Sequence, residues 1–202
     1  MITTEAPRVK HKGTNMTSCV HARHSELLRF IDQRVLKRGK FRLASGRESS
    51  YYLDGKLASM DPVGISLICD AIFDEIAHLG NVDAIGGMDM GATPIVGALA
   101  LRSGQIGRPL PTFVVRKAAK EHGTRKLIEG PLQSGMSVVI VDDVVTTGSS
   151  ILQAIDAVEQ QKCKVLLAIS VVDRDVGAGN LLTQRGISYQ PLVTVAELGL
   201  TQ

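Results

Sequence analysis

The chain has 202 residues, of which 44% are hydrophobic, and this size and composition favour one folded domain with a single core. A net charge of +3 and the absence of Trp give no support to nucleic-acid binding. Three scattered cysteines do not suggest a disulfide framework or a zinc site, and no apolar run reaches the roughly 20 residues that span a bilayer. We therefore expect a cytoplasmic protein that binds neither nucleic acid nor membranes.

The first 22 residues carry basic side chains but have no apolar core, unlike a secretory signal. We expect residues 1–22 to be a disordered N-terminal extension and residues 23–202 to form the single domain. A start of translation at Met16 is a second interpretation that the sequence leaves open.

Apolar residues at helical and strand spacings alternate along the rest of the chain. Helices are predicted over residues 25–37, 61–79, 93–102 and 149–160, and strands over residues 84–87, 112–115, 138–141, 165–172 and 193–195. Residues 117–135 lack periodicity and are predicted to be a loop. This order predicts an α/β fold with a doubly wound, mostly parallel sheet flanked by helices. Ligands bind such sheets beyond the carboxyl ends of the strands, where Arg116, Asp142 and Arg174 are expected to converge.

Two acidic residues, Asp142 and Asp143, directly follow the strand predicted over 138–141. They are followed by Val144, Val145, Thr146, Thr147, Gly148, Ser149 and Ser150, and then by a predicted helix. Small hydroxyl residues at such a turn leave backbone N–H groups free at a helix N-terminus, which favours a phosphate. Adjacent carboxylates suit ribose hydroxyls and a magnesium-bound polyphosphate. An ordinary helix N-cap, the alternative interpretation, needs only one such residue.

Positive charge is concentrated in the predicted loop after residue 115. Its basic residues are Arg116, Lys117, Lys120, His122, Arg125 and Lys126, against a single Glu121. Such a loop suits a ligand that carries pyrophosphate, and it could close as a lid that excludes water. A solvated basic loop without function is the alternative.

These segments resemble those of a known enzyme family. Residues 138–150 are similar to the phosphoribosyl-pyrophosphate (PRPP) binding motif of the type I phosphoribosyltransferases. Residues 41–54 and 116–123 resemble the N-terminal signature and the catalytic loop of the orotate phosphoribosyltransferases. The three segments occur in the family's order and spacing, and the likeness covers roughly residues 24–198. The resemblance implies the type I fold with a small N-terminal hood.

The resemblance also implies a reaction. Orotate and PRPP would give orotidine 5′-phosphate and pyrophosphate, a step of de novo pyrimidine synthesis. Mg²⁺ is the implied cofactor, held mainly through PRPP and water and not directly by protein side chains. The implied assembly is a homodimer in which the loop 116–130 acts in trans on the neighbouring active site.

Individual roles follow from the same resemblance. The implied PRPP-binding residues are Arg116, Lys117, Lys120, His122, Asp142, Asp143, Val144, Val145, Thr146, Thr147, Gly148, Ser149 and Ser150. Asp142, Asp143, Lys120 and His122 are implied to be catalytic. Thr146 and Arg174 are implied to bind orotate, although an arginine at a strand end is often a surface ion-pair residue. Tyr51 and Tyr52 could cover the pyrimidine ring or pack in the core.

The chain departs from part of the family at two positions. Ala44 and Gly91 stand at or near places where some members carry a lysine, which leaves two substrate contacts open. Two alternatives to the orotate reaction also remain, transfer to a different base and a non-catalytic PRPP-sensing regulator. A regulator could lose the cationic loop, so its retention here favours an enzyme.

Overall fold

The structure is a computed structural model, and it describes residues 24–42, 46, 48–118 and 126–200. The predictions made for residues 1–22, Ala44, Lys120 and His122 fall outside these described residues.

A six-stranded sheet forms the centre of the molecule, in the strand order β5-β4-β3-β6-β7-β8. Its strands are β3 (Ala84–Met88), β4 (Thr112–Val115), β5 (Ile128–Glu129), β6 (Ser137–Val145), β7 (Lys164–Asp173) and β8 (Tyr189–Thr194). Neighbouring strands are parallel, except that β5 runs antiparallel to β4. The predicted doubly wound, mostly parallel sheet is confirmed.

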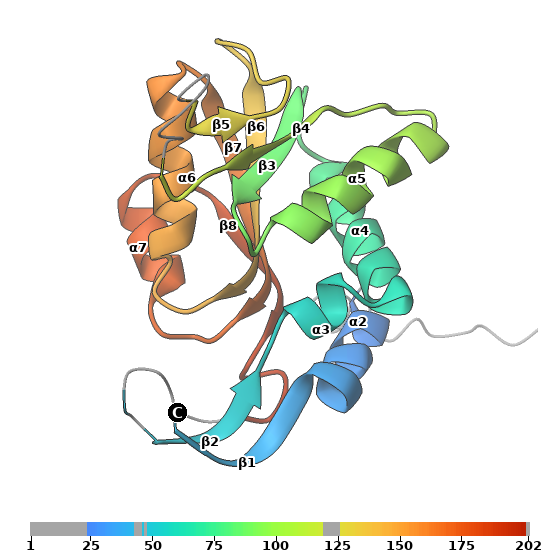
Figure 1. Ribbon diagram of the computed structural model, residues 1–202, viewed down its shortest axis with the longest axis vertical. Coiled ribbons are helices and arrows are strands. Elements are labelled where there is room, and N and C mark those ends of the chain that lie inside the picture. Colours follow the sequence, from blue (N-terminus) through green and yellow to red (C-terminus); the bar gives the residue numbers. More distant parts are fainter. Residues whose placement is uncertain (1–23, 43–45, 47, 119–125, 201–202) are drawn as a thin grey trace, which may run out of the picture.

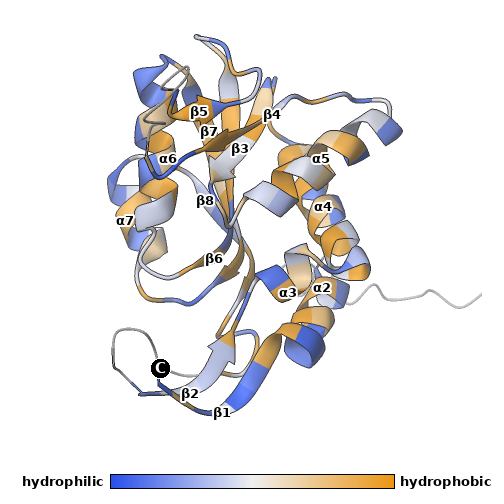
Figure 2. Cartoon of the chain, viewed as in Figure 1, coloured by the Kyte–Doolittle hydropathy of each residue, from blue (hydrophilic) through white to orange (hydrophobic). Residues whose placement is uncertain are grey.

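Helices cover both faces of this sheet (Figure 1). The helices α4 (Pro62–Ile76) and α5 (Thr93–Gln105) lie on one face, and α6 (Ser149–Gln160) and α7 (Ala178–Gln184) lie on the other. Figure 2 shows both hydrophobic and hydrophilic stretches along α4 and α6, as expected for helices that pack on one side only.

Strand β6 supplies side chains to the cores on both faces. Val139 and Val141 belong to the cluster beneath α4 and α5, whereas Val138 and Ile140 belong to the cluster beneath α6. All four side chains are buried. An uninterrupted apolar run is the pattern expected of a strand covered on both faces.

Helix α4 begins where the sequence predicts it. The Asp61 carboxylate accepts the backbone N–H groups of Val63 and Gly64 at 2.8 and 3.0 Å, and Pro62 occupies the first turn. The helix ends at Ile76, three residues before the predicted end at 79, while α5 runs three residues beyond the predicted 102.

The helix predicted over residues 25–37 is too long. Helix α2 (Ser25–Phe30) continues as a π-helical turn, η1 (Ile31–Val35), and the chain then enters β1 (Leu36–Arg42). β1 pairs antiparallel with β2 (Glu48–Leu53), and this hairpin, the hood, stands apart from the main sheet (Figure 1). The side chains of β1 are mostly exposed, so its sequence has no apolar alternation to reveal a strand.

Several short elements were not predicted. They are α3 (Lys56–Ser59), α7, and β5, which occupies part of the predicted loop 117–135. The last strand was predicted over 193–195, but β8 spans Tyr189–Thr194 and carries Pro191, which is typical of an edge strand. Such elements are too short or too polar to produce a periodic signal.

Candidate active site

The order in which successive strands are added to the sheet reverses between β3 and β6. After β3 the chain crosses through α5 to β4 on one side, whereas after β6 it crosses through α6 to β7 on the other. The last β3–β6 pair is Gly86 with Ile140, but β6 continues along β7 to the pair of Val145 with Asp173. Such a topological switch point is where ligands bind in open α/β sheets.

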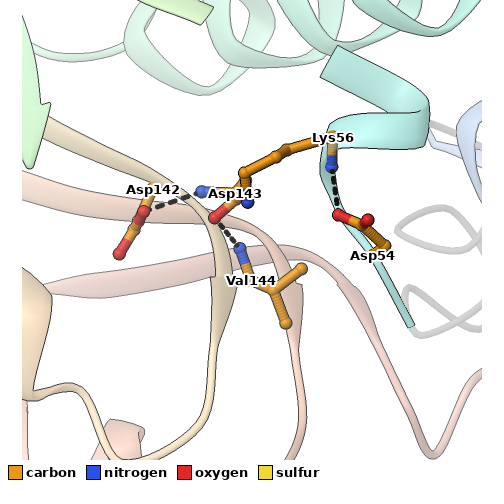
Figure 3. A network of polar contacts seen from close by, with 5 residues as sticks. All are labelled: Asp54, Lys56, Asp142, Asp143 and Val144. Carbon is orange, nitrogen blue, oxygen red and sulfur yellow. Dashed lines mark hydrogen bonds and ion pairs between the residues drawn. The ribbon is translucent and has the colours of Figure 1, made fainter. Parts of the chain in front are cut away.

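Asp142 and Asp143 lie at this point, inside β6. The sequence placed them after a strand ending at 141, and this is corrected by the pairing of Asp142 with Ser170 of β7. Asp142 Oδ1 accepts the Asp143 N–H at 3.0 Å, and Asp143 Oδ1 accepts the Val144 N–H at 2.8 Å (Figure 3). The two residues are only 6% and 8% exposed, so both carboxylates are held by the backbone in a largely buried position.

Two glycines from other segments press against this acid pair. A Cβ atom on Gly91, in the loop between β3 and α5, would overlap Oδ1 of both Asp142 and Asp143. A Cβ atom on Gly55, just before α3, would lie 2.9 Å from both Cβ and Oδ2 of Asp143. No ordinary Cβ contact is that short, so a side chain at either position would force neighbouring atoms of the acid pair to shift. The side chain missing at Gly91 thus makes room for the acid pair.

Burial and repulsion between the two carboxylates both change the pKa of Asp142. Burial raises the pKa of Asp142 to about 7, and the neighbouring negative charge of Asp143 also raises it. Lys56, the first residue of α3, opposes this rise, with its Nζ 3.7 Å from Asp143 Oδ2. Neither Gly55 nor Lys56 was singled out from the sequence. The only signal for them was their position directly after the segment 41–54 that carries the resemblance.

The turn after β6 forms a small cavity. Gly148 has a left-handed backbone (φ 83°) and precedes α6, whose N-terminus has no side-chain cap. A cavity of about 130 Å³ is lined here by Asp142, Val144, Val145, Thr146, Thr147, Gly148, Ser149, Ser150 and Ile151. Uncapped N–H groups and the positive end of a 12-residue helix favour an anion in this cavity.

Arg174 connects this turn to the hood. Its backbone N–H donates to the Val145 carbonyl at 2.9 Å, which fixes it beside the end of β6. Its guanidinium lies over the ring of Tyr51, 5.0 Å from the centroid, and its Nε donates to the Tyr51 hydroxyl at 3.4 Å. Tyr51 is buried in the core, whereas Tyr52 is 41% exposed and packs on Phe41. Of the two roles open to Tyr51, core packing is therefore the observed one.

A polar cluster on β7 and β8 lies beside Asp142 of the acid pair. The hydroxyls of Ser170 and Tyr189 are hydrogen-bonded at 2.6 Å, and Ser170 is the β7 partner of Asp142. Burial raises the pKa of Tyr189 and also that of Asp173 at the end of β7. No sequence pattern indicated this cluster, because Tyr189 lies 19 residues after Ser170 and on a different strand.

Arg116 stands at the carboxyl end of β4, at the base of the cationic loop. Its backbone N–H donates to the Leu127 carbonyl at 2.8 Å, and its Nη1 lies 3.6 Å from Glu129 Oε1 in β5. These contacts bring the two ends of the loop together. Lys117 is exposed beside Arg116.

No helix in the described part of the chain is long and apolar enough to cross a membrane.

Comparison with known proteins agrees with this geometry. Residues 64–184 match the family model for the phosphoribosyl transferase domain. An orotate phosphoribosyltransferase of Tropheryma whipplei (strain Twist) is 41% identical over 173 residues, which cover 86% of this chain and 81% of that protein.

Two crystal structures of the Mycobacterium tuberculosis H37Rv orotate phosphoribosyltransferase are also similar. One has a TM-score of 0.79 at 35% identity and covers 88% of this chain and 99% of that chain. The other, a complex with PRPP, has a TM-score of 0.74 at 32% identity with the same coverage of both chains. By its sequence, its sheet topology and these relatives, the chain belongs to the orotate phosphoribosyltransferases, within the phosphoribosyl transferase domain family.

Proposed function

We propose that this orotate phosphoribosyltransferase binds PRPP at the switch point between β3 and β6 and transfers the 5-phosphoribosyl group to orotate there. The products are orotidine 5′-phosphate and pyrophosphate. The observation that carries the proposal is that three features lie next to one another at the end of β6, a place that we call the crevice. Asp142 of the acid pair and the uncapped turn before α6 line one cavity, and Arg174 is hydrogen-bonded to Val145 of that cavity.

The cavity before α6 is the proposed site of the 5′-phosphate. Residues Thr146, Thr147, Gly148, Ser149 and Ser150 offer hydroxyls and backbone N–H groups at a helix N-terminus. A phosphate held here would fix the ribose against Asp142, which lines the same cavity. Val144 and Val145 contribute backbone to this site. Holding the donor in one orientation contributes to the rate because the reacting groups no longer have to find one another.

Asp142 and Asp143 are the proposed residues for the ribose. Displacement at the anomeric carbon develops positive charge on the sugar, as in glycoside chemistry. Fixed carboxylates in a largely buried site stabilise such charge more than they would in water. The orotate ring nitrogen forms the new bond while the bond to pyrophosphate breaks, so no covalent enzyme intermediate is required.

The departing pyrophosphate needs positive charge. Arg116 and Lys117 stand at the base of the cationic loop, and Lys120 and His122 are proposed to complete the set as catalytic residues. Mg²⁺ would supply further charge neutralisation, with oxygen ligands from PRPP and water. Among the described residues, no three His, Cys, Asp or Glu side chains are grouped to hold a metal ion. We propose that the loop 116–130 acts on the neighbouring active site in a homodimer.

Arg174 and Thr146 are the proposed orotate contacts. The Arg174 backbone is held by Val145 and its guanidinium by Tyr51, which fixes the residue beside the turn after β6. A guanidinium binds a carboxylate through two parallel hydrogen bonds. Orotate carries such a carboxylate, whereas uracil, hypoxanthine and adenine do not.

The test is turnover of PRPP with each of these four bases in the presence of Mg²⁺. The proposal predicts rapid turnover with orotate and little with the other three. Rapid turnover with another base would show a different acceptor. PRPP binding without turnover of any of them would favour the regulator.

A further inference from the structure

Lys56 lies directly after the hood and contacts the acid pair, although it precedes Asp143 by 87 residues in the sequence. Its Nζ lies 3.7 Å from Asp143 Oδ2, and the Lys56 side chain extends over Asp143 in Figure 3. The Lys56 side chain is 45% exposed and that of Asp143 is 11% exposed, so the lysine lies closer to solvent than the carboxylate does.

The backbone around Lys56 is fixed by two contacts. The Lys56 N–H donates to Asp54 Oδ1 at 3.1 Å, which sets the start of α3 (Figure 3). Gly55 approaches so closely that an added Cβ would lie 2.8 Å from Val144 Cγ2 and 2.9 Å from Asp143 Oδ2. The residue before Lys56 therefore packs directly on the end of β6, which holds the lysine beside Asp143.

The contact is electrostatic in character. At 3.7 Å the two charged groups form an ion pair but are too far apart for a good hydrogen bond. Asp143 has its Oδ1 occupied by the Val144 N–H, so Oδ2 is the oxygen that faces Lys56. Two adjacent carboxylates repel each other, and a cation on the outer side of Asp143 draws its carboxylate away from Asp142.

We propose that Lys56 is a positioning residue for the transfer reaction, acting through Asp143 by holding its carboxylate at the ribose side of the crevice. This rests on the proposed role of the acid pair. It assigns Lys56 no separate contact with PRPP or orotate.

A double-mutant cycle tests this, with turnover of PRPP and orotate as the readout. Asp143→Asn alone is expected to lower kcat at least about 100-fold, because it removes charge aimed at the transition state. Lys56→Met alone is expected to lower kcat about tenfold, but less than about twofold when Asp143 is already Asn. Lys56→Arg, which keeps the charge, should retain kcat within about threefold of the parent. Equal losses from Lys56→Met in both backgrounds would overturn the proposal, because they would mean that Lys56 acts independently of Asp143.

Two further measurements separate positioning of Asp143 from a general effect of charge or stability. Lys164→Met deletes an exposed lysine at the opposite end of the sheet, and it should leave kcat unchanged. Melting temperatures separate a structural effect from a catalytic one, and Lys56→Gln replaces Lys56→Met if the latter fails to fold. A loss of kcat that only accompanies a large fall in melting temperature would also overturn the proposal.

The same double-mutant cycle is measured a second time with PRPP affinity as the readout, by calorimetry and without any acceptor base. Lys56→Met should weaken PRPP binding about threefold in the parent and have no measurable effect in Asp143→Asn. Failure of the parent to turn over orotate would contradict the proposed function. Equal effects of Lys56→Met on PRPP affinity in the two backgrounds would contradict the role of Lys56.

Discussion

Asp142 and Asp143 occupy an environment that is unfavourable for two negative charges. Both are largely buried, and only part of the cost is offset by the backbone N–H groups of Asp143 and Val144 and by Lys56. Active sites often retain groups of this kind, because the arrangement that serves the transition state is not the one that stabilises the fold.

Asp142→Asn is therefore expected to stabilise the protein in a pH-dependent way. The folded-state pKa of Asp142 is raised from 3.8 to about 7, so the folded protein binds a proton there that the unfolded chain has lost. The parent accordingly loses stability as pH rises from about 4 to about 7, by a few kcal/mol, whereas the Asn variant does not. The free energy of unfolding, measured in denaturant from pH 4 to 8, should differ little at pH 4 and most above pH 7.

The matched control is Asp74→Asn, which makes the same chemical change at an exposed position on α4 instead of in the buried site. A stability gain for Asp142→Asn that stays constant from pH 4 to 8 would mean that burial does not perturb Asp142.

At the level of elements, the unit β6–α6 could be predicted because its signals are local. Four consecutive apolar residues, two acids and a run of Thr, Gly and Ser all lie within residues 138–150. The hood could not be predicted as a hairpin, because most β1 side chains are exposed and Leu36 is the only buried one. α3, β5 and α7 are each too short for periodicity to be recognised.

Gly148→Ala tests the turn between β6 and α6. Gly148 has φ 83°, and an added Cβ would lie 3.3 Å from Ala178 Cβ, so alanine should destabilise the fold by about 1 kcal/mol or more. It should also raise the KM for PRPP, because the N–H groups that face the cavity would shift.

Gly186→Ala is the matched control. Gly186 has φ 77°, lies just after α7, and has open space around an added Cβ. Its stability loss should be similar, but its KM for PRPP should equal that of the parent. If both variants had the parent's KM, the turn would not be the phosphate site.

For the molecule as a whole, the crevice depends on contacts that the sequence did not reveal. The expectation that Asp142, Arg116 and Arg174 follow strand ends on one side of the sheet came from a general property of parallel sheets. The close approach of Gly91 and Gly55 to the acid pair is different, because it depends on the packing of residues far apart in the chain. The contact of Tyr51 with Arg174 spans 123 residues in the same way.

The proposed homodimer can be tested by mixing two inactive variants. Lys120→Ala and Asp143→Asn should each be nearly inactive alone. If the loop acts in trans, a mixed dimer has one site with both residues intact, and free exchange of subunits should restore about a quarter of the parent activity. If each loop served its own subunit, the mixture would be no more active than the separate variants. Subunit exchange must be verified independently for this outcome to count.

Arg174 is where the hood, the turn after β6 and the end of β7 meet, so it tests the assignment of the acceptor most directly. Loss of a well-aligned charged partner for a desolvated carboxylate costs a few kcal/mol. The decisive measurement is kcat/KM of Arg174→Ala for orotate and for uracil, together with its affinity for PRPP. We predict a fall of roughly 100-fold with orotate, little change in PRPP affinity, and no further loss with uracil, a poor acceptor for the parent as well. Use of orotate by Arg174→Ala as efficient as that of the parent would contradict the assignment.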